Sequence, residues 1–103
     1  MFLEEKKGEN IVLLDINEVS DFTDYFVICS GSSERMIKAL ADDTVRNMRN
    51  IHKIRGRSEG ESQNGWILVD FDSVILHILS PEKRNYYKLE ELWSEGKVLL
   101  HLQ

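Results

Sequence analysis

Two short motifs in this sequence have residue types and a spacing that could handle a nucleotide. The segment GSS, Gly31 to Ser33, stands between an apolar stretch and a helical pattern, where backbone N–H groups can bind phosphate. Asp70 and Asp72 are two residues apart in DFD, at the end of another apolar stretch, as a magnesium-binding pair requires. Together the motifs raise the hypothesis of magnesium-dependent chemistry on a phosphate group.

The same residues also have a purely structural interpretation. Ser32 or Ser33 can cap a helix, and Asp70 and Asp72 can mark a turn. The chain is acidic and has few basic side chains to bind a triphosphate. The structural interpretation is therefore favoured. A magnesium-dependent nucleotidyltransferase, whose Gly-Ser and Asp-x-Asp signature this spacing resembles, is the alternative function.

The histidines and the cysteine form no pattern typical of a metal site. His52, His77 and His101 lack metal-ligand spacing with Cys29, so we expect neither a metal nor a cofactor. No residue near Cys29 in the sequence would lower the pKa of its thiol. Cys29 is therefore interpreted as a small buried hydrophobic residue rather than a nucleophile.

Length and charge narrow the classes of function. A chain of 103 residues can bury one modest core, so we expect a single domain over residues 1–103. Eighteen acidic and thirteen basic residues give a net charge of −5, which disfavours nucleic acid and favours a basic protein partner. No apolar run is long enough to span a membrane, no secretory signal precedes the domain, and a single Cys29 excludes internal disulfides. We expect a cytoplasmic protein.

The hydrophobic pattern predicts a mixed α/β domain. Ile11 to Ile16 and Asp24 to Gly31 are apolar stretches typical of strands, and Ser32 or Ser33 begins a helix that runs to Ile51. A short strand is predicted around Lys53 to Arg57, followed by a polar loop. The order of elements, two strands, a helix, three strands and a helix, indicates a small mixed sheet with packed helices.

The segments WILVDF and VILHIL predict a β-hairpin with Asp72 and Ser73 as its turn. A two-residue turn pairs Phe71 with Val74 and places one set of six apolar side chains on the core face. The opposite face then carries the pairs Trp66 and Leu79, Leu68 and His77, and Asp70 and Ile75. This second face is unusually apolar. Either helices cover it, or part of it is left exposed for a partner.

The segment SPEKRNYYKLEELW predicts a helix that is capped by Ser80 and begins at Pro81. A continuous helix would place Tyr86, Leu89, Leu92 and Trp93 on one packing stripe. Tyr87 falls off that stripe, and packing and partner binding remain equal alternatives for it. The C-terminal SEGKVLLHLQ either extends the sheet or pairs with another subunit.

Several of these segments, taken in order, resemble the Iojap family, the ribosomal silencing factors known as RsfS. The resemblance runs from about Asn10 to Trp93 and depends mainly on DYFVICSGSS, on GWILVDF followed by a strand histidine, and on SPEKRNYYKLEELW. The sequence departs from the family's pattern in its Asp72-Ser73 turn and in a shorter N-terminal helix. The resemblance implies a nucleotidyltransferase-like α/β fold without established catalysis, in which the Gly-Ser and Asp-x-Asp motifs reflect a shared fold rather than a working site.

The resemblance also implies a function and a partner. Family members bind protein fourteen of the large ribosomal subunit and block joining with the small subunit when nutrients are short. Carried over to this chain, the hairpin and the following helix form the partner-binding surface. Independently of the resemblance, a homodimer contact is expected at the sheet edge or the C-terminal tail, because a small mixed sheet leaves an edge unpaired. The predicted partner-binding residues are Trp66, Leu68, Asp70, His77, Leu79, Arg84 and Tyr87.

Overall fold

Six strands and four helices make up the described part of the chain, residues 2–92 and 95–102, in a computed structural model. The strands are β1 (Glu9–Asp15), β2 (Tyr25–Ser30), β3 (Arg57–Glu61), β4 (Trp66–Asp70), β5 (Val74–Leu79) and β6 (Lys97–Leu102). The helices are α1 (Phe2–Glu5), α2 (Glu34–His52), α3 (Pro81–Tyr87) and α4 (Leu89–Leu92), and a single 3-10 turn, η1, covers Ser62–Asn64.

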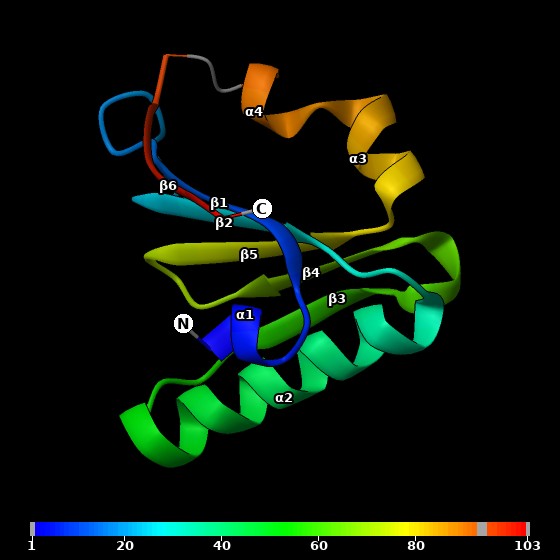
Figure 1. Ribbon diagram of the computed structural model, residues 1–103. Helices are drawn as coiled ribbons and strands as arrows, with labels where there is room; N and C mark the ends of the chain where they lie inside the picture. The colour runs from blue at the N-terminus through cyan, green and yellow to red at the C-terminus, as the bar shows by residue number, and fades with distance from the viewer. Residues whose placement is uncertain (1, 93–94, 103) are drawn as a thin grey trace.

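The six strands form one mixed sheet in the order β3-β4-β5-β2-β1-β6. The central pair, β2 and β5, is parallel, and the other neighbours are antiparallel. Figure 1 shows α1 and α2 on one side of this sheet and α3 and α4 on the other. The prediction of a small mixed sheet with packed helices is confirmed, whereas its nucleotidyltransferase-like character stays a prediction.

The longest helix, α2, forms where the sequence predicts it and covers one face of the sheet. The Ser33 hydroxyl accepts a hydrogen bond from the Met36 N–H at 3.1 Å, and the helix ends at Lys53, which adopts a left-handed conformation. Ile37, Leu40 and Ala41 are buried against the hairpin side chains of the core face. This layer fixes which side of the hairpin is core.

The opposite face of the sheet, here called the α3 face, has a second and smaller core. Its buried members come from β1, the segment after it, β2, β5 and α4, and Val19, Trp66 and Leu68 pack against them while half-buried. The buried members are Leu14, Ile16, Phe26, Ile28, Ile75, Leu79 and Leu89. The two alternatives for this face therefore each hold in part, since its centre is covered and one side remains accessible.

Two predicted elements differ from the structure. The third strand spans Arg57–Glu61 and not Lys53 to Arg57, because these are the residues that pair with β4. All residues of this strand are exposed. A strand without buried apolar residues shows no hydrophobic alternation, so the sequence pattern cannot reveal it. The C-terminal segment 97–102 follows one of its two alternatives and extends the sheet as β6, beside β1.

The predicted C-terminal helix is interrupted at Lys88. This residue has a φ of 48°, and its N–H donates to the Arg84 carbonyl, so α3 ends there and α4 begins in a new direction. Tyr86 is consequently exposed, whereas Leu89 is buried, and the single packing stripe that we predicted is wrong. The remaining part of that prediction, the Leu92 side chain and Trp93, lies outside what the structure describes.

Candidate functional site

The hairpin has the register that its two-residue turn predicts. Trp66 pairs with Leu79, Leu68 with His77, and Asp70 with Ile75, so these side chains share the α3 face. The Phe71 N–H donates to the Val74 carbonyl at 2.9 Å, and Asp72 takes a positive φ of 77° in the turn. The predicted parity of the hairpin is therefore confirmed.

The two strands of the hairpin differ in how far their side chains reach the surface. On β5, Leu79 is fully buried and His77 is only 5% exposed, because α3, α4 and neighbouring strands cover them. On β4, at the side of this core, Trp66, Leu68 and Asp70 are half-buried. A partner can reach the β4 side chains directly. The prediction that His77 and Leu79 contact a partner is corrected, since neither side chain is accessible.

Arg84 is also buried, at 8% exposure, and its predicted place on the border of the binding surface is corrected. Its guanidinium Nη1 donates to the Ser30 hydroxyl at 3.2 Å. Ser30 ends β2, so this bond ties α3 to the end of the sheet. Arg84 therefore supports the helix that carries Tyr86 and Tyr87.

Tyr87 joins the helix to the hairpin through its ring. The ring centroids of Trp66 and Tyr87 are 4.9 Å apart, and Tyr86 meets Tyr87 edge to face at the same distance. Tyr87 is 39% exposed and Tyr86 is 78% exposed. The two alternatives for Tyr87 thus combine, because one side of its ring packs and the other side is accessible. Tyr86, which we assigned to packing, is the most exposed member of this aromatic cluster.

Three acidic side chains, on β3 and β4, flank the same surface. Glu59 pairs with Leu68 and Glu61 pairs with Trp66, so both carboxylates extend from β3 on the α3 face. Asp70 is also on this face and forms an ion pair with Arg57 at 3.2 Å. The sequence pattern around Glu59 and Glu61 is typical of a polar loop and does not reveal them as site residues, because only the pairing of β3 with β4 brings them beside the tryptophan. We call Trp66, Leu68, Tyr86, Tyr87, Glu59, Glu61 and Asp70 the hairpin surface.

Beneath the hairpin surface, His77 contacts two aromatic rings. The Trp66 indole Nε1–H donates to His77 Nδ1 at 3.2 Å, and the ring of Phe26 meets the imidazole edge to face at 4.7 Å. Burial lowers the pKa of His77 from its ordinary 6.5 to about 4. The imidazole is therefore neutral at physiological pH.

The two halves of the proposed nucleotide motif lie at opposite ends of the sheet. The Gly31 N–H donates to the Leu79 carbonyl, whereas Asp70 is level with Ile75, about four residues or roughly 13 Å back along β5. One Asp70 carboxylate oxygen accepts a hydrogen bond from Arg57, and the other accepts one from the Asp72 N–H at 2.8 Å. The Asp70 carboxylate therefore stabilises the turn. The geometry therefore gives the nucleotidyltransferase alternative no support.

Metal and thiol chemistry receive no support either. Within residues 2–92 and 95–102, no group of three or more histidine, cysteine, aspartate or glutamate side chains is arranged to hold a metal ion. Burial raises the pKa of the Cys29 thiol to about 12, against a smaller opposing effect of Arg84, so the thiol stays protonated. The interpretation of Cys29 as a buried hydrophobic residue is confirmed. No described helix is both long and apolar enough to cross a membrane.

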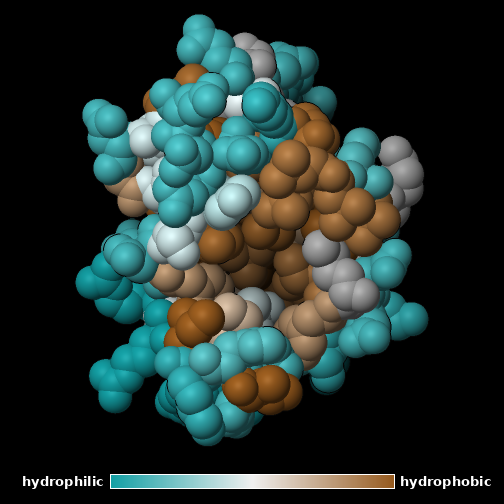
Figure 2. Space-filling view, turned by 90° about the vertical axis from the view of Figure 1, so that its left-hand side faces the viewer, coloured by the Kyte–Doolittle hydropathy of each residue, from teal (hydrophilic) through white to brown (hydrophobic). Residues whose placement is uncertain are grey.

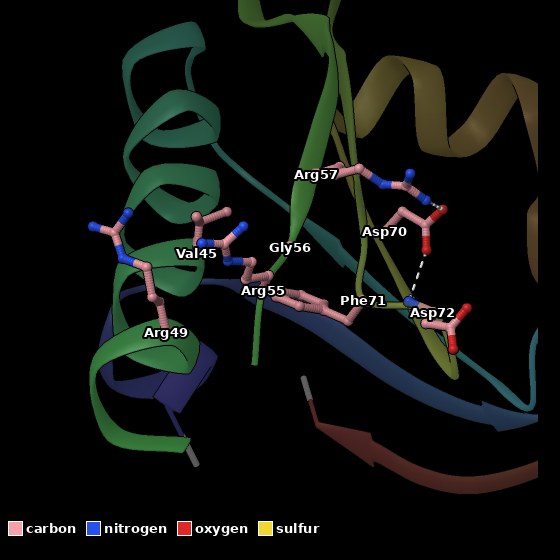
Figure 3. A pocket seen from close by; sticks show the side chains of 8 residues that line it. All are labelled: Val45, Arg49, Arg55, Gly56, Arg57, Asp70, Phe71 and Asp72. Atoms are coloured by element: carbon pink, nitrogen blue, oxygen red, sulfur yellow. Dashed lines mark hydrogen bonds and ion pairs between the residues drawn. The ribbon is translucent and has the colours of Figure 1, made fainter. Parts of the chain in front are cut away.

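Two hollows lie apart from the aromatic side chains of the hairpin surface. One, of about 490 Å³, is lined by Arg49, Arg55 and Phe71 among others, and Figure 3 shows that Arg57, which also lines it, points toward Asp70. The other, of about 270 Å³, is an apolar recess between α1, α2 and the sheet, on the face seen in Figure 2. Apart from Asp70, which lines the first hollow, neither is lined by a predicted partner-binding residue.

The profile of a protein family described as "Ribosomal silencing factor during starvation", RsfS, matches residues 1–102 of this chain. The chain belongs to the RsfS family. The match covers the hairpin surface, and the family prediction made from the sequence is confirmed.

Individual relatives agree with this assignment. The ribosomal silencing factor RsfS of Halalkalibacterium halodurans is 33% identical over 94 residues, which is 91% of this chain and 80% of that protein. A mouse protein named mitochondrial assembly of ribosomal large subunit protein 1 is 33% identical over 89% of this chain and 42% of its own length. A crystal structure of a Chromobacterium violaceum protein is similar with a TM-score of 0.84 at 32% identity, covering 89% of this chain and 77% of that one.

Proposed function

We propose that this protein binds the large ribosomal subunit through its protein fourteen and thereby blocks joining with the small subunit. Membership of a family of ribosomal silencing factors supports a role in restraining translation during starvation. The name of the mouse relative, which refers to assembly of the ribosomal large subunit, supports that subunit as the target. The site of action would be the cytoplasm.

The observation that carries the proposal is an accessible aromatic cluster with an acidic border. Trp66, Tyr86 and Tyr87 form a contiguous group of rings, and tryptophan and tyrosine are enriched among the residues that dominate binding energy at protein interfaces. Glu59 and Glu61 lie beside the strand that presents Trp66. Such a surface suits a basic protein, and ribosomal proteins are typically basic, because complementary charge speeds encounter and aromatic anchors slow release.

The mechanism requires no catalysis, cofactor or metal. The hairpin surface docks on the large-subunit protein, and the rest of the domain occupies space that the small subunit needs. The described chain has principal extents of 32 × 32 × 23 Å, so the body attached to the anchor is much larger than a side-chain contact. Blocking is then steric, and its extent depends on how fully the large subunit is occupied.

Sedimentation with purified ribosomal subunits tests the proposal. Excess protein should travel with the large subunit and lower the fraction of joined particles, and Trp66→Ala should weaken both effects. Ile51→Ala is the matched control, because Ile51 is an exposed apolar residue on α2, on the other side of the sheet. Wild-type protein that stays at the top of the gradient and leaves subunit joining unchanged would refute the proposed function.

A further inference from the structure

The hydrogen bond between Trp66 and His77 is a polar contact at the junction of a buried strand and an accessible one. Trp66 faces Leu79 directly and reaches His77 on the diagonal of the antiparallel pair. Across this diagonal a half-buried indole meets a buried imidazole. The bond therefore connects a side chain that a partner can reach to one that it cannot.

The direction of this bond defines the form of the histidine. An indole nitrogen only donates, so His77 Nδ1 accepts the bond and carries no proton. The proton of the neutral ring is then on Nε2, a buried atom without a hydrogen-bond partner among the described residues. A protonated ring would place a second donor opposite the indole N–H, and the bond would be lost.

Aromatic contacts fix the imidazole and the indole in place. Phe26 packs edge to face on His77 at 4.7 Å between ring centroids, so the imidazole has little freedom to turn. Trp66 lies 5.8 Å from His77 and 4.9 Å from Tyr87, which is the ring that leads to the surface. The position of the indole thus depends on the acceptor below it and on the tyrosine beside it.

We propose that His77 is a positioning residue that holds the Trp66 indole in its partner-binding orientation. The inference rests on the proposed function, because it concerns the same surface, and it assigns to His77 a role without direct contact. Without the acceptor, the indole N–H turns toward water to regain a hydrogen bond, since an unpaired buried donor is costly. The ring then leaves its place beside Tyr87, and the partner has to reorder it upon binding.

Two substitutions of His77 separate positioning from packing. His77→Leu removes the acceptor and replaces the imidazole with an apolar side chain of similar size. His77→Asn supplies a different acceptor, because its carbonyl oxygen is attached to Cγ, as Nδ1 is in histidine. We expect His77→Leu to weaken large-subunit binding about tenfold, which corresponds to about 1.4 kcal/mol. His77→Asn should recover most of that loss. His52→Asn, at an exposed histidine that ends α2 on the other side of the sheet, is the control and should bind like wild type.

Trp66→Phe keeps an aromatic ring but has no N–H to donate. In a double-mutant cycle, His77→Leu should therefore cost little further affinity when Trp66→Phe is already present. Fully additive losses in affinity would overturn the inference. A folded His77→Leu variant that binds the large subunit as tightly as wild type would also overturn it. So would a His77→Asn variant whose affinity is no higher than that of His77→Leu.

The indole N–H signal in a proton–nitrogen NMR spectrum gives a readout that does not require ribosomes. His77→Leu should shift the Trp66 signal and speed its exchange with water, and His77→Asn should return both toward wild type. If His77→Leu does not fold, the affinities of Trp66→Phe and His77→Asn for the large subunit still test the inference. It requires that Trp66→Phe binds more weakly than wild type and that His77→Asn binds nearly as well as wild type. Wild-type protein that fails to bind subunits refutes the proposed function, whereas an unchanged indole signal refutes the positioning role itself.

Discussion

At the scale of single residues, a few side chains determine the form of the hairpin surface, where we propose that the partner binds. Trp66 is half-buried against the smaller core and packs against Tyr87 with their rings tilted, so it contributes both to folding and to the accessible surface. His77 and Arg84 lie beneath that surface and orient the groups above them. The surface therefore depends on buried polar bonds as well as on exposed rings.

Trp66→Ala should weaken large-subunit binding by at least ~2 kcal/mol, the scale of an aromatic anchor at an interface. The loss of folding free energy should stay below the ~3–5 kcal/mol typical of a fully buried tryptophan, because Trp66 is half-buried. Thermal midpoint and affinity of the same variant check this. A midpoint that collapses, with affinity lost only as a consequence, would contradict the interface assignment.

The buried His77 should make stability depend on pH. Its pKa is about 4 in the folded protein and near 6.5 when unfolded, so the unfolded state binds the proton first as pH falls. The contribution of the neutral His77 to the free energy of unfolding is complete above pH 6.5. It is lost progressively between pH 6.5 and 4, and the total loss is about 3 kcal/mol. Denaturant unfolding at pH 7 and pH 4.5 should show a smaller drop in His77→Leu than in wild type. Equal drops would contradict this assignment of the pKa.

At the scale of elements, the short helix α3 presents the tyrosines and depends on contacts at its ends. It has seven residues, too few for stability in isolation, and Ser80 caps it by accepting from the Lys83 N–H at 3.2 Å. Arg84 fastens it to Ser30, and Lys88 ends it with a left-handed conformation. The orientation of Tyr86 and Tyr87 follows from these three attachments.

Ser80→Ala and Ser33→Ala form a matched pair, because each removes an N-cap hydroxyl from a helix. Each should lower the free energy of unfolding by about 1 kcal/mol. Only Ser80→Ala should also weaken large-subunit binding, since α3 carries Tyr87 whereas α2 covers the other side of the sheet. Urea unfolding and co-sedimentation measure the two effects, and equal losses of binding in both variants would show that α3 has no special role.

At the scale of the whole molecule, the two edges of the sheet are unlike. The outer edge at β3 is formed by exposed charged and small residues, Arg57 to Glu61. The other edge, β6, carries Val98 and Leu99 at 60% and 53% exposure. Charged residues protect a free strand edge from pairing, and apolar residues do not. We therefore expect any homodimer contact at β6 rather than at β3.

We expect the protein to form dimers through β6 as its concentration rises. Val98→Lys should shift this equilibrium toward the monomer, because a charge at the edge opposes strand pairing. Ser58→Lys, on the exposed β3 edge, is the control and should leave it unchanged. Light scattering over a range of concentrations measures the mass, and a constant monomer mass for wild type would reject the dimer.

Local sequence was enough to predict the features that depend on near neighbours. The register of the hairpin follows from its two-residue turn and the alternation of side chains, so the six hairpin residues of the α3 face were predicted before the structure. The Ser80 cap was predicted, and the cap of α2 was narrowed to Ser32 or Ser33, because a cap bonds to an N–H only three residues away. These contacts need no knowledge of the rest of the fold.

The tertiary structure decided how deep each residue lies and which distant segments meet. Glu59 and Glu61 reach the tryptophan only because β3 pairs with β4, and Arg84 is buried because Ser30, 54 residues earlier, accepts its hydrogen bond. His77 is buried beneath side chains of other elements, although Leu68, its cross-strand neighbour, is only half-buried. Periodicity along a chain specifies which face a side chain occupies, whereas its exposure depends on what packs over that face.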